Sequence, residues 1–154
     1  MSEIGDKIQA KCMAFADRVI RLNDYLLEQA ANRRAEGRSQ KADKRGKTQT
    51  SYVRHQTCRI PVHLQAIATL CNQLLRSGTS IGANNAEACN AISKADFKSK
   101  SYIALKEARE SLYWIDLLHR NGYLNDTQYK SIYDDCEELV KVLVHRCKKL
   151  DGAE

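Results

Sequence analysis

The chain has 154 residues with hydrophobic side chains at 43% of positions and aromatic ones at 6%, which predicts one domain with an aliphatic core. One proline and seven glycines leave few helix breaks, and no apolar run reaches the about 18 residues of a membrane-spanning helix. The N-terminus contains acidic residues and lacks the apolar stretch of a secretory signal, and six cysteines without a CxxC pair fit free thiols. We therefore expect a cytoplasmic protein without a membrane partner.

The first expected helix spans residues 4–31. Apolar side chains recur there at intervals of three and four residues, which is the pattern of an amphipathic helix. These side chains are Ile8, Cys12, Phe15, Val19, Leu22 and Leu26.

Residues 32–59 break this pattern and hold the positive charge of the chain. Nine cations stand there against Glu36 and Asp43, a net charge of +7 within a total of +6, so the remainder carries −1. The cations are Arg33, Arg34, Arg38, Lys41, Lys44, Arg45, Lys47, Arg54 and Arg59. With so few apolar residues, we expect a long flexible connection that contacts nucleic acid, with Tyr52 and His55 available for stacking. The alternative is a solvated linker without a role.

The second expected helix spans residues 61–90, with Pro61 suited to its first turn. Gly78 and Gly82 lie inside it, although a glycine there costs about 1 kcal/mol relative to alanine. Their spacing predicts close approach of a neighbouring helix or subunit. We therefore expect this helix to contribute to an oligomer interface. The candidate interface residues are Arg76, Thr79, Gly82, Asn84, Ala86 and Glu87.

Two polar residues of this helix have a second interpretation. Asn84 and Glu87 are predicted to be structural, with Arg76 or Arg109 as partners, because a buried carboxylate needs a partner to offset desolvation. The alternative is that Glu87 points into solvent.

The third and fourth helices are expected at residues 94–120 and 126–149. Ser93 with Asp96, and Asn125 with Gln128, have the spacing of capping boxes. Gly122 is placed to end the third helix in a left-handed conformation. The short connections predict antiparallel neighbours, and so an all-α, up-down four-helix bundle with the basic segment inserted between its first two helices.

No catalytic, metal or cofactor site is indicated by the sequence. His55, Cys58 and His63 do not have a recognised zinc spacing, and no Walker-type, dinucleotide or G-x-S-x-G pattern is present. The aspartates and glutamates at 134–138 read as an exposed helix face. We therefore expect a non-enzymatic protein that acts by interaction.

The stretches LLRSGTSIGANNAEA and SKADFKSKSYIALKEARESLYWIDLL resemble a bacterial four-helix-bundle family. That family is named for proteins encoded by intervening sequences of large-subunit ribosomal RNA genes, and is related to the accessory variability proteins of diversity-generating retroelements. The resemblance covers residues 62–145 well and 8–28 loosely. It implies a ring-shaped homopentamer without known catalytic activity, acting in some relatives with a reverse transcriptase and RNA.

The basic segment predicts a protein that binds RNA or a ribonucleoprotein. The resemblance implies that this protein is a homopentameric helical bundle, which could serve as an accessory protein to a reverse transcriptase. The alternative is a protein-only scaffold, whose basic segment would bind the acidic surface of another protein. A preparation that carries nucleic acid would favour the first hypothesis over the second.

Overall fold

The computed structural model describes the backbone of residues 3–43 and 62–152, and the side chains of residues 5–32 and 64–152. These residues form four α-helices and no strand, as the sequence predicts. The helices are α1 (Glu3–Asp43), α2 (Val62–Cys89), α3 (Lys94–Arg120) and α4 (Asp126–Leu150).

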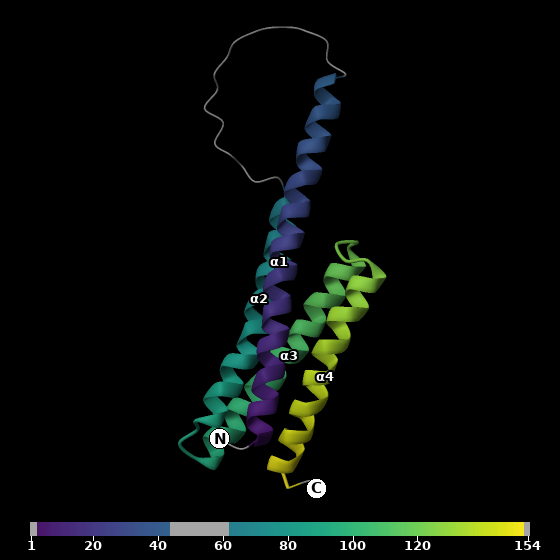
Figure 1. Cartoon of the computed structure of the whole chain (residues 1–154). Helices are drawn as coiled ribbons and strands as arrows, with labels where there is room; N and C mark the ends of the chain where they lie inside the picture. The colour runs from purple at the N-terminus through teal and green to yellow at the C-terminus, as the bar shows by residue number, and fades with distance from the viewer. Residues whose placement is uncertain (1–2, 44–61, 153–154) are drawn as a thin grey trace.

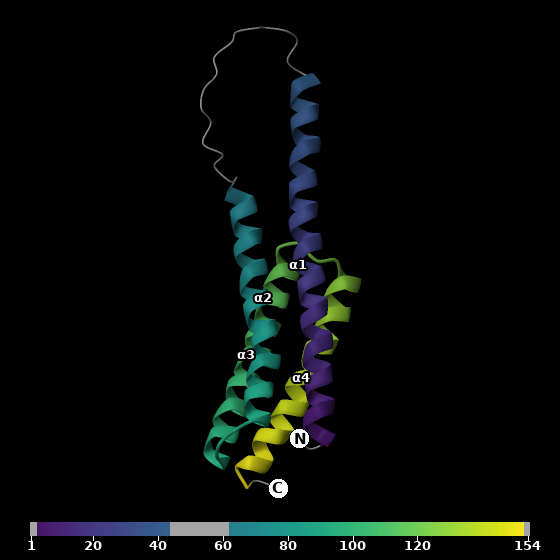
Figure 2. The same ribbon diagram turned by 60° about the vertical axis from the view of Figure 1, so that its left-hand side comes forward.

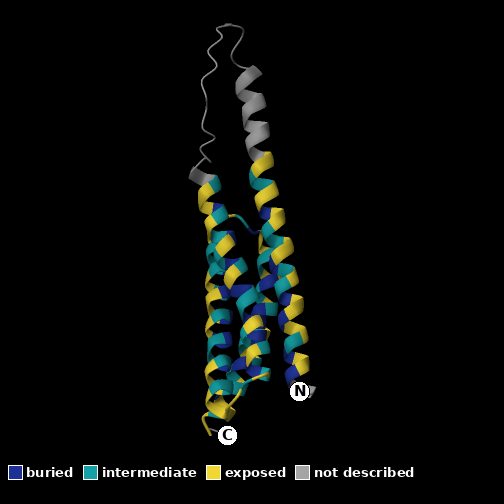
Figure 3. Cartoon of the chain, turned by 90° about the vertical axis from the view of Figure 1, so that its left-hand side faces the viewer, coloured by how far each residue is buried: buried dark blue, intermediate teal, exposed yellow. Residues whose placement is uncertain are grey.

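The helices pack as a closed square in which each contacts its two neighbours along the chain and α4 returns to α1 (Figures 1 and 2). Neighbours are antiparallel, so the N-terminus of α1 and the C-terminus of α4 lie at the same end of the bundle. Buried residues follow the inner face of each helix, while the outer faces are exposed (Figure 3). The core is aliphatic, with Phe15 its one buried phenylalanine among the described residues.

Two glycines allow α2 to approach α1 closely. A Cβ atom built on Gly78 would lie 3.1 Å from Cγ2 of Val19, and one built on Gly82 would lie 3.4 Å from Cβ of Cys12. A side chain at Gly78 would therefore force Val19 to shift, and any residue larger than alanine at Gly82 would meet α1. The close neighbour that the sequence predicts for these glycines is thus a helix of the same chain.

Ion pairs join α1 to its other neighbour, α4. Nζ of Lys11 lies 2.6 Å from Oε1 of Glu138. Arg18 pairs with Asp135 and also donates to Oγ of Ser131 at 2.8 Å. All these side chains reach solvent, so the pairs fix the relative position of the two helices more than they stabilise the fold.

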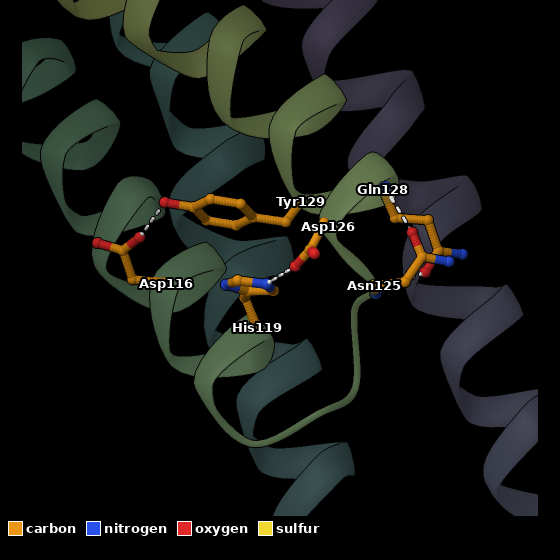
Figure 4. Close-up of polar contacts among 6 residues, drawn as sticks. All are labelled: Asp116, His119, Asn125, Asp126, Gln128 and Tyr129. Carbon is orange, nitrogen blue, oxygen red and sulfur yellow. Dashed lines mark hydrogen bonds and ion pairs between the residues drawn. The ribbon is translucent and has the colours of Figure 1, made fainter.

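The turn between α3 and α4 follows the predicted cap residues (Figure 4). Asn125 accepts a hydrogen bond from the backbone N–H of Gln128, and Oε1 of Gln128 accepts one from the backbone N–H of Asn125, which completes the capping box. Gly122 adopts the left-handed conformation with φ of 71°. The Ser93 cap forms as well, but Asp96 accepts from the backbone N–H of Ile92 and not from that of Ser93.

The predicted end of the first helix is wrong. The sequence places it at residue 31, whereas α1 continues to Asp43 and extends past the α3–α4 turn (Figure 1). The helix continues because arginine, alanine, glutamate, glutamine and lysine are good helix formers and no proline interrupts them. The N-terminal part of the predicted flexible connection is therefore helical, and its remainder at 44–61, with Pro61, lies outside the described residues.

The close approach at Gly82 yields the first testable prediction. We expect Gly82→Leu to lower the free energy of unfolding by about 1–3 kcal/mol, because the new side chain overpacks the contact with Cys12. Ala83→Leu is the matched control, since Ala83 is the adjacent residue and is exposed. Urea unfolding followed by circular dichroism measures both. Equal stabilities for the two variants would contradict the assigned α1–α2 contact.

Candidate nucleic-acid interface

The basic segment begins on the part of α1 that extends beyond the bundle. Residues 32–43 are helical, and four of the nine predicted nucleic-acid-binding cations belong to them: Arg33, Arg34, Arg38 and Lys41. The other five, Lys44, Arg45, Lys47, Arg54 and Arg59, lie outside the described residues, and so does Tyr52. The backbone thus carries the start of the positive segment away from the nearly neutral bundle (Figure 2).

The six candidate interface residues of α2 occupy three different environments. Gly82 is buried against α1, Thr79 and Ala86 are half-buried, and Arg76 and Glu87 are exposed. Asn84 donates to the backbone carbonyl of Ser80, one turn earlier in its own helix. Glu87 pairs with Lys100 of α3, and not with Arg76 or Arg109 as the sequence suggests. The Glu87 side chain is 55% exposed within the single chain, which fits the alternative interpretation, and its place in an oligomer stays a prediction.

The buried polar residue of this helix is Asn85, which the sequence analysis does not single out. Its Nδ2 donates to Oε1 of Gln9 on α1 at 2.6 Å, and its Oδ1 accepts from Nη1 of Arg146 on α4 at 2.7 Å. Asn85 is fully buried, and the Arg146 guanidinium lies 5.6 Å from the centre of the Phe97 ring of α3. One amide therefore connects α1, α2 and α4, and the arginine that it holds reaches α3.

A signal for Asn85 is present in the sequence. Buried residues of α2 recur at alternating intervals of four and three, and Asn85 takes its place in that series between Ile81 and Ala88. The series is Ile67, Cys71, Leu74, Gly78, Ile81, Asn85 and Ala88. A single polar residue in an apolar core row fixes which partners can face it, because leaving its amide unpaired is costly.

Four of the described cysteines, Cys12, Cys71, Cys136 and Cys147, are buried in the core. Burial raises the pKa of Cys12 and Cys71 to about 11 and that of Cys136 to about 12. These thiols are protonated near neutral pH and lack the thiolate that nucleophilic chemistry requires. The described residues also contain no group of His, Cys, Asp and Glu that could hold a metal ion, while the side chains of His55, Cys58 and His63 are outside that part of the chain.

Three large apolar side chains are exposed on the outer face of α1 at intervals of seven residues. Met13, Ile20 and Leu27 are 55%, 42% and 37% exposed. Seven residues are close to two helical turns, so the three share one face. Covering these three side chains would remove apolar surface from water. Within the described residues, none of the helices is long and apolar enough to cross a membrane.

The comparisons with known proteins agree with this architecture. Residues 53–145 match the family described as 23S rRNA-intervening sequence protein. The chain belongs to this family. A crystal structure from Bacteroides thetaiotaomicron, described as a protein of unknown function from the S23 ribosomal protein family, is 33% identical, with a TM-score of 0.68. The alignment covers 94% of this chain and 98% of that one. No curated protein sequence matches the chain. The family assignment made from α2 and α3 is therefore confirmed.

The Asn85 network supplies the second prediction. We expect Asn85→Ala to lower the free energy of unfolding by about 1–3 kcal/mol, because Gln9 and Arg146 lose their partner in a buried site. Asn84→Ala and Glu87→Ala are the controls, since Asn84 bonds only within its own helix and Glu87 is exposed. Both should leave the urea midpoint nearly unchanged. A larger loss for either control than for Asn85→Ala would contradict the assigned roles.

Proposed function

We propose that this protein binds RNA, alone or within a ribonucleoprotein, and that the basic segment 32–59 supplies most of the attraction. The observation that supports this is the division of charge: the segment carries +7 and the rest of the chain −1. The family name, which refers to intervening sequences of 23S rRNA, supports RNA over other polyanions as the partner. One ribonucleoprotein that fits this proposal is a reverse transcriptase with its bound RNA.

The mechanism is electrostatic. Arginine and lysine side chains that neutralise phosphates release condensed counterions, and this makes the affinity strongly dependent on salt. Phosphate contacts position a protein on RNA without reading its sequence, so the segment gives general affinity. The backbone of α1 runs on past the bundle to Asp43, so the segment begins on a helix that could orient bound RNA relative to the bundle.

We further propose that the protein is a homo-oligomer, a pentamer, in which the exposed apolar row of α1 contributes to the interface. Covering Met13, Ile20 and Leu27 removes apolar surface from water, which favours association. Five copies of the basic segment in one assembly would act together on one RNA, so their weak contacts would add to a strong one.

The basic segment is tested by neutralising the six cations Arg33, Arg34, Arg38, Lys44, Arg45 and Lys47 to glutamine. We expect weaker binding to all RNA sequences, and a dependence of log affinity on log salt that is flatter by about 0.7–0.9 for each lost phosphate contact. Fluorescence anisotropy of labelled RNA at several salt concentrations measures this. Equal affinities and slopes would leave the segment as a linker and shift the preference to a protein-only scaffold.

The oligomer is tested with one lysine substitution on each candidate face. Ile20→Lys places a charge in the apolar row of α1, and Ala83→Lys places the same charge on the exposed face of α2. We expect light scattering to report an oligomer for the wild type and for Ala83→Lys, and a smaller species for Ile20→Lys. A monomeric wild type would refute the assembly, while dissociation by Ala83→Lys alone would place the interface on α2.

A further inference from the structure

A cleft of about 980 Å³ opens at the end of the bundle where α1 begins and α4 ends. It lies at the opposite end of α1 from the basic segment. Its walls come from all four helices: Gly5 and Ile8 of α1, the end of α2, the first turns of α3, and the last three turns of α4. Chain segments that are far apart in sequence therefore form one concave surface.

Among the described residues, the side chains that line the cleft include cations and no carboxylate. Its charged side chains are Lys94 and Lys98 of α3 and Arg146 and Lys149 of α4, accompanied by His145. Since the chain outside 32–59 has a net charge of −1, these four cations leave −5 for the rest of it. Cations from α3 and α4 thus line one hollow, and this arrangement raises the local concentration of anions.

Packing and helix capping do not account for all of these cations. Lys98 pairs with Asp151 at 2.7 Å, and Arg146 is held by Asn85, so both have structural partners. Lys149 suits the C-terminus of α4. Lys94, however, is the first residue of α3 and is exposed, and a cation at that end is disfavoured by the helix dipole. Its position is favourable once an anion lies beside it.

The lining also offers an aromatic surface. Phe97 is half-buried in the cleft, and the guanidinium of Arg146 lies 5.6 Å from the centre of its ring. Planar groups next to cations are the combination that holds a nucleotide, because the base stacks while the phosphate is neutralised. A free inorganic anion would use only the lysines.

We propose that this cleft is a second RNA-contact site, which binds the phosphodiester groups of RNA through Lys94, Lys98 and Lys149 with a base against Phe97. The inference rests on the proposed RNA binding. About 27 residues of α1 separate Gly5 from the start of the basic segment, a length of roughly 40 Å at 1.5 Å per residue. An RNA that contacts both sites therefore runs along the bundle.

The test compares two triple variants that lose the same charge. The cleft variant removes the three lysines of the cleft and leaves Arg146 in place; its substitutions are Lys94→Gln, Lys98→Gln and Lys149→Gln. The control variant removes three exposed cations outside the cleft; its substitutions are Lys106→Gln, Arg120→Gln and Lys130→Gln. With labelled single-stranded RNA, we expect the cleft variant to lose about 0.7 in the salt slope for each lost contact, and the control to follow the wild type. Thermal unfolding by circular dichroism verifies that both variants are folded.

The outcomes separate the two proposals. Binding by the wild type with equal slopes for both variants overturns the cleft and leaves the basic segment as the binding site. A wild type that binds no RNA at any salt concentration overturns the cleft and the proposed function together. If the cleft variant fails to fold, wild-type protein is photo-crosslinked to RNA that contains 4-thiouridine. Crosslinks in the peptide with Phe97 support the cleft, and crosslinks confined to 32–59 overturn it.

Discussion

The close approach of α1 and α2 is the constraint on which the bundle depends. Gly78 and Gly82 let Val19 and Cys12 of α1 lie directly against α2, where a larger side chain would separate the helices. That distance brings Gln9 within reach of Asn85, and Asn85 in turn holds Arg146 of α4. The glycines thus make possible a polar network that joins four helices and fixes their register, which an aliphatic core alone specifies less well.

Local signals in the sequence predict those features whose physics is local. The boundaries of α3 and α4 follow from Ser93, Gly122 and Asn125, because a cap or a left-handed turn is decided by a few adjacent residues. The end of α1 is mispredicted because a loss of apolar periodicity indicates a loss of burial, and a helix of good helix formers continues without burial. Of the neighbours Asn84 and Asn85, the first is predicted from the sequence to be structural, whereas the second makes the described contacts between helices. Partners on distant helices decide between them, although the spacing of the core row favours Asn85.

The arrangement of charge separates the stability of the protein from its proposed interactions. The ion pairs between α1 and α4 reach solvent, so they orient two helices that an apolar core already holds together. The positive excess lies elsewhere, on the segment that α1 carries past the bundle and in the cleft at the other end. None of these cations except Arg146 is among the residues that the Asn85 network joins, and this makes the proposed function accessible to experiment.

The central claim is that RNA is the natural partner, and purification at low salt tests it most directly. The account predicts that protein isolated without a high-salt wash has an absorbance ratio at 260 to 280 nm well above that of pure protein. It further predicts that ribonuclease, but not deoxyribonuclease, lowers this ratio, as does high salt. Protein that elutes free of nucleic acid at low salt, bound instead to an acidic protein, would contradict the account and favour a protein-only scaffold.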